Sequence, residues 1–334
     1  MEPEDGMARS LAVSIERFPI AGRFTIARGS RTEAVVVTVT IAQDGAVGRG
    51  ECVPYARYGE TVEGVAQSIE SLRERIVAGL DRTALQDALP AGGARNALDC
   101  ALWDLEAKLA GIPAYVTAGI DRLGPATTAY TISLDDPATM AAATARAAHR
   151  PILKIKLGAP EGDLLRIEAV RRAAPDATLV ADANEGWTED NLMLHLQACA
   201  AAGFVLVEQP LRAGEDAILG EIARPVPVCA DESVHDRNDL PHLVGRYDAI
   251  NIKLDKAGGL TEALLLAREA QERGFAIMVG CMLGSSLAMA PAMLLTPGAR
   301  FVDLDAPLLL ARDRELGLTY TGSIVEPPSP ALWG

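Results

Sequence analysis

The sequence predicts an α/β fold, a modified TIM-type (β/α) barrel preceded by a smaller α+β domain. Its 334 residues are enough for a barrel of about 250 residues and a smaller partner. From about residue 125 onward, short apolar segments alternate with helical segments, and eight apolar segments can be counted. Strict strand–helix alternation is typical of a parallel sheet, and eight βα units at this spacing favour a barrel over an open sheet.

The first 120 residues show a different pattern, which predicts three strands followed by helices. The expected strands are Leu11–Glu16, Ala34–Ile41 and Val47–Cys52, and the expected helices are Val62–Ala78, Thr83–Ala88 and Ala94–Leu109. Gly and Ser within Phe24–Arg31 predict a loop there. We therefore expect an α+β domain at residues 1–120, completed by residues 310–334, and a barrel domain at residues 121–309. Residues 1–8 are expected to be a disordered tail.

Charged residues follow the apolar segments of the barrel again and again. The candidate strands are Thr127–Ser133, Ile152–Leu157, Thr178–Ala183, Phe204–Glu208, Val226–Ala230, Ala249–Leu254, Phe275–Gly280 and Phe301–Asp305. The charged residues at their ends are Lys156, Asp182, Glu208, Asp231, Lys253, Asp303 and Asp305. Because the carboxyl ends of barrel strands converge on one mouth, where active sites lie, these side chains are expected to meet there.

Composition excludes several classes of partner. The net charge is −14 and no basic run occurs, so neither nucleic acid nor an anionic membrane is expected as a partner. Five scattered cysteines indicate reduced thiols, and four scattered histidines argue against a zinc site. The acidic start is no signal peptide and no apolar run could span a bilayer, so a cytoplasmic protein is expected. A homo-oligomer is left open.

The segment Pro151–Gly158 carries two lysines in an otherwise apolar strand. Lys154 and Lys156 are two residues apart, so their side chains share one face of the strand. An exposed edge strand with a lysine face is one interpretation. The other is that both ammonium groups are buried, which is costly unless something compensates them.

Three of the charged residues, Asp182, Glu208 and Asp231, are carboxylates on successive strands. Each alone has another interpretation, as a helix cap or a turn residue. Together they should repel one another unless a cation lies among them. All-oxygen ligation favours Mg²⁺, with Mn²⁺ as the alternative, and we expect one ion per subunit.

These residues resemble the enolase superfamily, in its muconate-lactonising-enzyme subgroup, over almost the whole chain. The motifs that carry the resemblance are Lys154-Ile-Lys156, Asp182-Ala-Asn184, Glu208-Gln-Pro210, Asp231-Glu-Ser233, Asn251-Ile-Lys253-Leu-Asp-Lys256-Ala-Gly-Gly259, and Asp303-Leu-Asp305. Within the subgroup the chain looks most like the dipeptide epimerases. Further support comes from Ala27-Arg-Gly-Ser-Arg31, from Glu51–Glu60 and from Arg95–Asp104.

The resemblance implies a role for each candidate residue. Asp182, Glu208 and Asp231 would bind the metal, and Lys156 and Lys253 would be the two acid/base lysines. Lys154 would support Lys156, and Asp303 and Asp305 would hold the ammonium group of a substrate. The resemblance also implies that the N-terminal domain caps the barrel.

Chemistry explains why such residues suit an epimerase. Removing a proton next to a carboxylate gives an unstable dianionic enediolate, which a divalent metal stabilises. The base must be neutral near pH 7, and we expect Lys154, the metal and a closed site to lower the pKa of Lys156. Lysines on the second and sixth strands would face each other across the barrel, so one removes the proton and the other returns it from the opposite face.

The expected substrate is a dipeptide such as L-Ala-L-Glu or L-Ala-D-Glu. Asp303 and Asp305 suit its ammonium group, Arg28 or Arg31 suits a side-chain carboxylate, and Met282 is expected to line the pocket. The alternatives are another reaction of the subgroup, namely o-succinylbenzoate synthesis, N-acylamino acid racemisation or cycloisomerisation. A non-catalytic small-molecule binder on the same fold is a further alternative.

Overall fold

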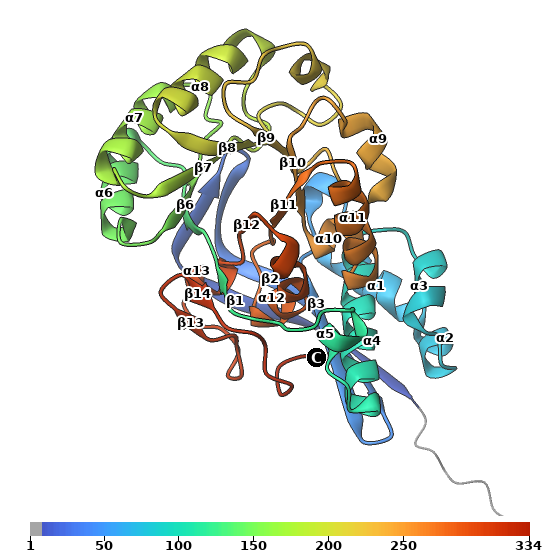
Figure 1. Ribbon diagram of the computed structural model, residues 1–334. Helices are drawn as coiled ribbons and strands as arrows, with labels where there is room; N and C mark the ends of the chain where they lie inside the picture. Colours follow the sequence, from blue (N-terminus) through green and yellow to red (C-terminus); the bar gives the residue numbers. More distant parts are fainter. Residues whose placement is uncertain (1–8) are drawn as a thin grey trace, which may run out of the picture.

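The computed structural model describes residues 9–334, so the predicted tail at residues 1–8 lies outside the described residues. The N-terminal part is an antiparallel sheet with helices packed on it (Figure 1). Its elements are β1 (Ser10–Ile26), β2 (Gly29–Gln43), β3 (Ala46–Cys52), η1 (Ala56–Tyr58), α1 (Val62–Glu70), α2 (Arg73–Val77), α3 (Arg82–Ala88), α4 (Gly93–Ala110) and α5 (Ala114–Thr117). Three strands followed by helices confirm the predicted order.

The first two strands are much longer than predicted, and the loop predicted at Phe24–Arg31 is wrong. This segment is the tip of the β1–β2 hairpin, in which Phe24 pairs with Arg31 and Ile26 pairs with Gly29. Only two residues turn the chain, and Gly29 with φ of 141° permits so tight a reversal. The helix predicted over residues 62–78 is also wrong in part, because it breaks into α1 and α2.

The second part is a parallel sheet of eight strands that curls into a barrel, as the sequence predicts. Its strands are β5 (Tyr130–Ile132), β6 (Ile152–Lys156), β7 (Thr178–Asp182), β8 (Phe204–Glu208), β9 (Val228–Ala230), β10 (Ala249–Ile252), β11 (Ala276–Val279) and β12 (Phe301–Val302), and they are neighbours in that order. The backbone N–H of Ala129 donates to the carbonyl of Val302 at 2.8 Å, which joins the two outer edges of the curled sheet.

Helices and short 3₁₀ turns surround this sheet (Figure 1). They are α6 (Pro137–Ala147), α7 (Asp163–Ala173), α8 (Glu189–Ala201), η2 (Ala217–Gly220), η3 (Arg237–Asp239), α9 (Leu240–Leu243), α10 (Leu254–Ala257), α11 (Leu260–Glu272), α12 (Ser286–Ala292), η4 (Met293–Gly298) and α13 (Ala306–Leu309). The segment between β8 and β9 is therefore a 3₁₀ turn and not a long helix. No helix within residues 9–334 has the length and apolar character needed to cross a membrane.

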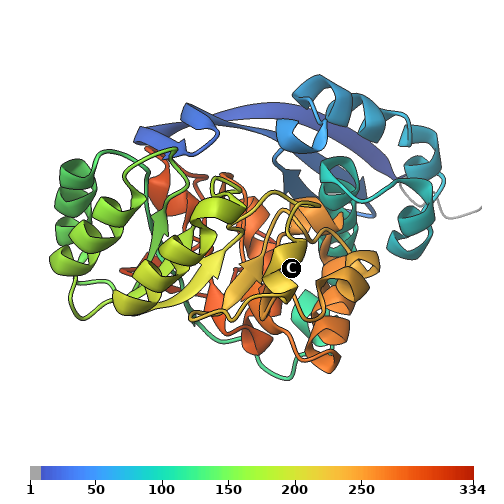
Figure 2. The ribbon, with the colours of Figure 1, turned by 90° about the horizontal axis from the view of Figure 1, so that it is seen from above.

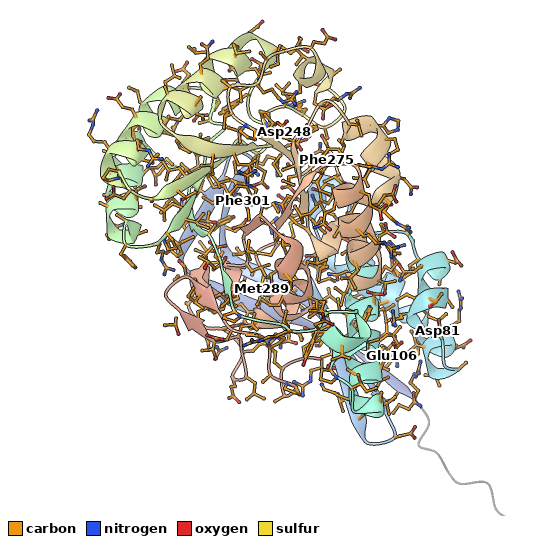
Figure 3. The ribbon with its side chains drawn as sticks, in the orientation of Figure 1. Asp81, Glu106, Asp248, Phe275, Met289 and Phe301 are labelled. Atoms are coloured by element: carbon orange, nitrogen blue, oxygen red, sulfur yellow. The ribbon has the colours of Figure 1, made fainter. Side chains whose placement is uncertain are left out.

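Apolar side chains fill the inside of the barrel below the charged strand ends. Val180, Leu206, Cys229, Ala249, Met278 and Phe301 form one buried cluster, each from a different strand. Phe301, labelled in Figure 3, comes from β12, one of the strands that form the ring. The packed interior keeps water away from the base of the site and fixes the strand register above it.

The N-terminal sheet lies over the barrel, and the β1–β2 hairpin reaches across it towards α6 and α7 (Figure 2). At the other side, α4 is fastened to the turn after β10. Arg95 donates to the carbonyls of Ala257 (2.7 Å) and Gly258 (3.0 Å). Gly258 has φ of 78°, and a Cβ there would lie 2.5 Å from the Arg95 guanidinium, so the close approach requires glycine.

The C-terminal segment runs back to both parts. Its short hairpin, β13 (Tyr320–Thr321) and β14 (Ile324–Val325), pairs with β4 (Ala126–Thr127). Arg314 donates to Glu16 at 2.9 Å and to Glu51 at 2.6 Å, both in the N-terminal sheet. These contacts agree with the expectation that residues 310–334 complete the N-terminal domain, but the domain boundaries stay a prediction.

Candidate active site

The charged residues predicted to meet do so at the carboxyl ends of the barrel strands. In the strand register Lys156 is level with Asp182, and Asp182 is level with Glu208. Asp231 directly follows β9, and Lys253 directly follows β10. All five side chains are buried, and so is that of Lys154. The exposed edge strand considered for Lys154 and Lys156 is therefore excluded.

On the β6 side, two lysines bind the carboxylates of neighbouring strands. The Lys156 Nζ atom donates to Asp182 Oδ2 at 2.5 Å. The Lys154 Nζ atom lies 2.7 Å from Glu208 Oε2 and 3.2 Å from Asp182 Oδ2. It also donates to Asp303 Oδ2 at 2.7 Å. Lys154 thus connects the carboxylate cluster to the segment after β12.

On the β10 side, two further lysines bind one carboxylate. The Lys253 Nζ atom donates to Asp231 Oδ2 at 2.6 Å, and Lys256 Nζ donates to Asp231 Oδ1 at 2.5 Å. Lys256 also donates to the Asn251 carbonyl at 3.1 Å. Asp231 is therefore held from two sides.

Burial and these ion pairs shift the pKa values in opposite directions. Burial raises the pKa of Asp231, but Lys253 and Lys256 outweigh burial and hold that pKa well below its ordinary value. Burial and the neighbouring Asp182 raise the pKa of Glu208 to about 8. Burial lowers the pKa of Lys253, but the carboxylates of Asp231 and Glu208 outweigh burial and raise it.

The cations that lie among the three carboxylates in this structure are lysine ammonium groups. Each carboxylate of Asp182, Glu208 and Asp231 has a lysine ammonium within 2.7 Å. These ammonium groups offset the repulsion between the carboxylates. Within residues 9–334, no group of three or more His, Cys, Asp or Glu side chains is drawn together closely enough to hold a metal ion.

The same carboxylates nevertheless suit a hard divalent cation in their chemistry. They supply only oxygen atoms, from three consecutive strands of one sheet. Glu208 Oε2 is buried and accepts no well-directed hydrogen bond, despite its short contact with Lys154. A buried carboxylate oxygen without a hydrogen bond is costly in the absence of a further partner, so the donor set fits Mg²⁺.

Two motif residues without an assigned role, Asn251 and Gln209, hold the carboxylates in position. Asn251 Nδ2 donates to Glu208 Oε1 at 2.7 Å. Gln209 Oε1 accepts from the backbone N–H groups of Asp231 (2.8 Å) and Ser233 (3.1 Å). Both residues stand inside the motifs that carry the family resemblance, and this position was the signal in the sequence that could have indicated a role for them.

Asp303 and Asp305 lie beyond the last strand, because the strand predicted over Phe301–Asp305 ends at Val302. Asp303 binds Lys154 through Oδ2, while its buried Oδ1 has no hydrogen-bond partner among the described residues. Asp305 Oδ2 accepts from the Thr131 backbone N–H at 2.6 Å. Burial and the neighbouring Asp303 raise the pKa of Asp305 to about 7.

A cavity of about 470 Å³ lies at the mouth of the barrel, and neither Asp303 nor Asp305 is among the residues that line it. Lys156, Lys253 and Asp231 line it from the barrel, and Met282 lines it from the loop after β11, as predicted. Its other walls come from the hairpin tip (residues 24–31) and from residues 55–58. The N-terminal sheet thus covers the pocket.

The two candidate arginines at the hairpin tip differ in their partners. Arg28 donates to Glu232 Oε1 at 2.6 Å and to the Asn184 carbonyl at 2.8 Å. The Arg31 guanidinium lies 5.6 Å from the centre of the Tyr55 ring, and no carboxylate of the described chain pairs with it. Arg28 is therefore engaged by the protein, and Arg31 is the free cation of the two.

Family models match both parts of the chain. Residues 8–117 match the N-terminal domain of mandelate racemase and muconate lactonizing enzyme, and residues 138–317 match the "Enolase C-terminal domain-like" model. Two curated relatives are similar over most of their length. The L-Ala-D/L-Glu epimerase of Escherichia coli is 47% identical, over 94% of this chain and 98% of that protein. The N-acetyl-D-glutamate racemase of a Pseudoalteromonas species is 44% identical, over 90% of this chain and 95% of that protein.

Solved structures agree. One is an enolase family member of Agrobacterium tumefaciens with homology to dipeptide epimerases, solved with sodium and L-Ala-L-Glu bound and with an ordered loop. It is 57% identical to this chain with a TM-score of 0.96, and the match covers 98% of this chain and 100% of that chain. A dipeptide epimerase of Enterococcus faecalis complexed with Mg and L-Leu-L-Tyr has a TM-score of 0.89, 30% identity, and coverage of 96% and 97%. The resemblance is confirmed: the chain belongs to the enolase superfamily, in its mandelate racemase and muconate-lactonizing-enzyme branch.

Proposed function

We propose that this chain is a dipeptide epimerase that inverts the α-carbon of the C-terminal residue of a dipeptide such as L-Ala-L-Glu. One observation carries the proposal: two lysines from opposite sides of the barrel reach one cavity. Lys156 lies on β6 and Lys253 follows β10, with three strands between them in the sheet. Each side chain is only 8% exposed, and both line the cavity.

Each lysine would serve one face of the α-carbon. In one direction Lys156 removes the α-proton and Lys253 delivers a proton from the opposite side. In the other direction the roles exchange, because epimerisation is reversible. A pair of bases on the two faces accounts for inversion without a leaving group, which distinguishes this reaction from a dehydration.

Asp182, Glu208 and Asp231 would hold one Mg²⁺ per subunit, with Mn²⁺ as the alternative. When bound, the cation would stabilise the negative charge on the substrate carboxylate as the α-proton leaves, and would compete with the lysines for the three carboxylates. The Mg-bound dipeptide epimerase structure among the relatives supports this choice of metal.

The two ends of the dipeptide would meet opposite charges. Asp303 offers its free Oδ1 atom to the substrate ammonium, while Lys154 fixes its other oxygen. Asp305 would add negative charge beside it above the pKa of that carboxyl group, which is about 7. Arg31, the free cation above the pocket, would bind the side-chain carboxylate of a glutamate, and Met282 would contact the apolar part of the substrate.

Racemisation of an N-acylated glutamate is the second candidate, since one relative with 44% identity is named N-acetyl-D-glutamate racemase. The two reactions share both lysines and the carboxylates. They differ at the substrate nitrogen, which is an ammonium in a dipeptide and an uncharged amide in an N-acyl amino acid. The buried free oxygen of Asp303 favours the dipeptide.

The experiment is a panel of L-Ala-L-Xaa dipeptides and N-acetyl-L-glutamate, incubated with the enzyme and Mg²⁺ in D₂O and examined by mass spectrometry. We expect deuterium uptake at the α-carbon to be fastest for L-Ala-L-Glu. Arg31→Ala should slow L-Ala-L-Glu selectively and spare dipeptides with a neutral second residue. Wild-type preference for a hydrophobic or cationic second residue would contradict the acidic assignment, and absence of exchange in every substrate would contradict an epimerase.

The cysteines bear on the cellular compartment of the protein. All five cysteines are free, which supports a reducing compartment such as the cytoplasm. The possibility of a homo-oligomer stays a prediction, which light scattering of the purified protein would test.

A further inference from the structure

One carboxylate, that of Glu185, binds both segments of the N-terminal domain that cover the pocket. Glu185 Oε1 accepts from Arg57 Nη2 at 2.8 Å, and Oε2 accepts from Arg57 Nε at 2.9 Å. Oε2 also accepts from Arg28 Nη1 at 3.2 Å. Arg28 is at the hairpin tip and Arg57 is in the segment 55–58, so two separate covering segments meet at one acidic side chain.

Glu185 itself is firmly fixed to the barrel. Its side chain is 6% exposed, and Oε1 also accepts from the Ala213 backbone N–H at 3.0 Å. Its own N–H donates to the Gln209 carbonyl at 2.8 Å. The covering segments are thus attached to a rigid point at the end of β7.

The backbone at Glu185 is unusual for a residue with a side chain. Asn184 has φ of 44° and Glu185 has φ of 66°. Non-glycine residues seldom adopt this left-handed region, and such residues persist where the surrounding structure imposes them, often at functional sites. The two-residue turn directs the Glu185 carboxylate away from the barrel and towards the two arginines.

The ion pairs also determine which cation remains for a ligand. Arg28 is bound by Glu185 and Glu232, and Arg57 is bound by Glu185. Arg28 Nη2 donates in addition to the Tyr55 hydroxyl at 3.2 Å, and it is the Tyr55 ring that the Arg31 guanidinium faces. Of the three arginines that line the cavity, only Arg31 has no carboxylate partner among residues 9–334.

We propose that Glu185 is a positioning residue for substrate binding: its carboxylate clamps the hairpin tip and the segment 55–58 over the pocket, and so sets Arg31 and Tyr55 over the side chain of the substrate. The acidic dipeptide in this inference rests on the function proposed above. The clamp itself does not, because it is a property of the protein without substrate.

The first test measures the clamp directly, by hydrogen–deuterium exchange of the full-length protein. In Glu185→Gln, the backbone amides of residues 24–31 and 55–58 should exchange roughly ten times faster or more, since two charge-assisted contacts are weakened. Amides of the barrel strands should keep their rates. Arg57→Gln should accelerate residues 55–58 more than residues 24–31, because Arg28 keeps its contacts with Glu185 and Glu232. It provides a second variant if Glu185→Gln folds poorly.

The matched control is Glu33→Gln, which breaks the Arg17–Glu33 ion pair on the same hairpin. That pair is exposed, with 49% of the Glu33 side chain accessible, and exposed pairs contribute little. Exchange at residues 24–31 and 55–58 should not change in this variant. Equal acceleration in Glu33→Gln and Glu185→Gln, or none in Glu185→Gln and Arg57→Gln, would overturn the clamp.

The second test separates positioning from chemistry by kinetics with L-Ala-L-Glu and Mg²⁺. Glu185→Gln should raise KM roughly ten- to a hundred-fold, the equivalent of one or two charge-assisted hydrogen bonds, with a much smaller change in kcat. Because Arg57 and Glu185 act as a pair, the double variant should be no worse than Glu185→Gln alone. A fall in kcat at unchanged KM would overturn the positioning role. Failure of wild-type protein to epimerise any dipeptide would remove the proposed function, while the exchange result would still decide the clamp.

Discussion

The two lysines proposed as bases have closely similar immediate surroundings but very different attachments to the covering domain. Each donates to one carboxylate, Lys156 to Asp182 at 2.5 Å and Lys253 to Asp231 at 2.6 Å. Each has a more deeply buried lysine behind it, Lys154 or Lys256. Similar surroundings suit two bases that exchange roles when the reaction runs in the opposite direction.

The difference lies in what reaches each lysine from the N-terminal domain. Asp255, two residues after Lys253, accepts from the Val53 backbone N–H and from Asn96 Nδ2, each at 2.9 Å. Those contacts are buried. Lys156 instead meets the hairpin tip, with its Nζ atom 5.8 Å from the centre of the Phe24 ring. Lys253 therefore lies next to a buried contact between the barrel and the N-terminal domain, whereas Lys156 is covered by the tip of the β1–β2 hairpin.

The largest expected effect acts on both lysines at once. Removal of the metal with a chelator should abolish epimerisation in both directions, and added Mg²⁺ should restore it, as polarimetry would show. Circular dichroism should stay unchanged, because lysine ammonium groups already offset the three carboxylates. Full activity of the metal-free protein would contradict the assignment of Asp182, Glu208 and Asp231.

Replacement of a single lysine should remove one base and leave the other. Lys156→Ala or Lys253→Ala should each lower the epimerisation rate by about 10²–10⁴-fold, the usual contribution of general acid–base catalysis. The comparison predicts losses of similar size in the two variants. If Lys253→Ala epimerised at the wild-type rate, the two-base mechanism would be wrong.

A smaller effect should follow from Asp303→Asn. Asp303 is on the Lys156 side of the site, because it accepts a hydrogen bond from Lys154, which lies on the same strand as Lys156. We expect kcat/KM to fall roughly ten- to a hundred-fold for every dipeptide, since a charge-assisted hydrogen bond contributes about 1.5–3 kcal/mol. The loss should not depend on the second residue, in contrast to Arg31→Ala. Steady-state kinetics with L-Ala-L-Glu and a neutral dipeptide would check this. Unchanged kcat/KM would exclude Asp303 as the ammonium contact.

The sequence could predict the barrel and the order of its charged residues, because the interval between them is the length of one βα unit. It could not predict that lysines would pair with the carboxylates, since Lys154 and Asp303 lie 149 residues apart and meet only when the sheet curls. Nor could it predict the hairpin tip, because Arg-Gly-Ser is equally typical of a loop. The role of Gln209 depends on an unusual backbone angle, φ of 35°, which no local pattern indicates.

The smallest effect concerns stability on the Lys253 side. Burial raises the pKa of Asp255 from 3.8 to about 7. The folded protein therefore retains this proton where the unfolded chain has lost it, so Asp255 lowers the free energy of unfolding as pH rises from about 4 to 7, by up to about 1.4 kcal/mol per pH unit. Asp255→Asn should reduce that slope and leave the Lys156 side unaffected. Urea denaturation between pH 4 and 8 would show it, and an unchanged slope would mean that Asp255 does not titrate in this range.

The most direct test of the two-base account measures proton exchange separately for each epimer. Lys156→Ala and Lys253→Ala are incubated with L-Ala-L-Glu and with L-Ala-D-Glu in D₂O, and deuterium at the α-carbon is followed by mass spectrometry and NMR. We predict that each variant exchanges the α-proton of one epimer much faster than that of the other, that the two variants choose opposite epimers, and that inversion in each is about 10²–10⁴-fold slower than in the wild type. Exchange of both epimers at similar rates by one variant, or faster exchange of the same epimer by both, would contradict the claim that the two lysines serve opposite faces.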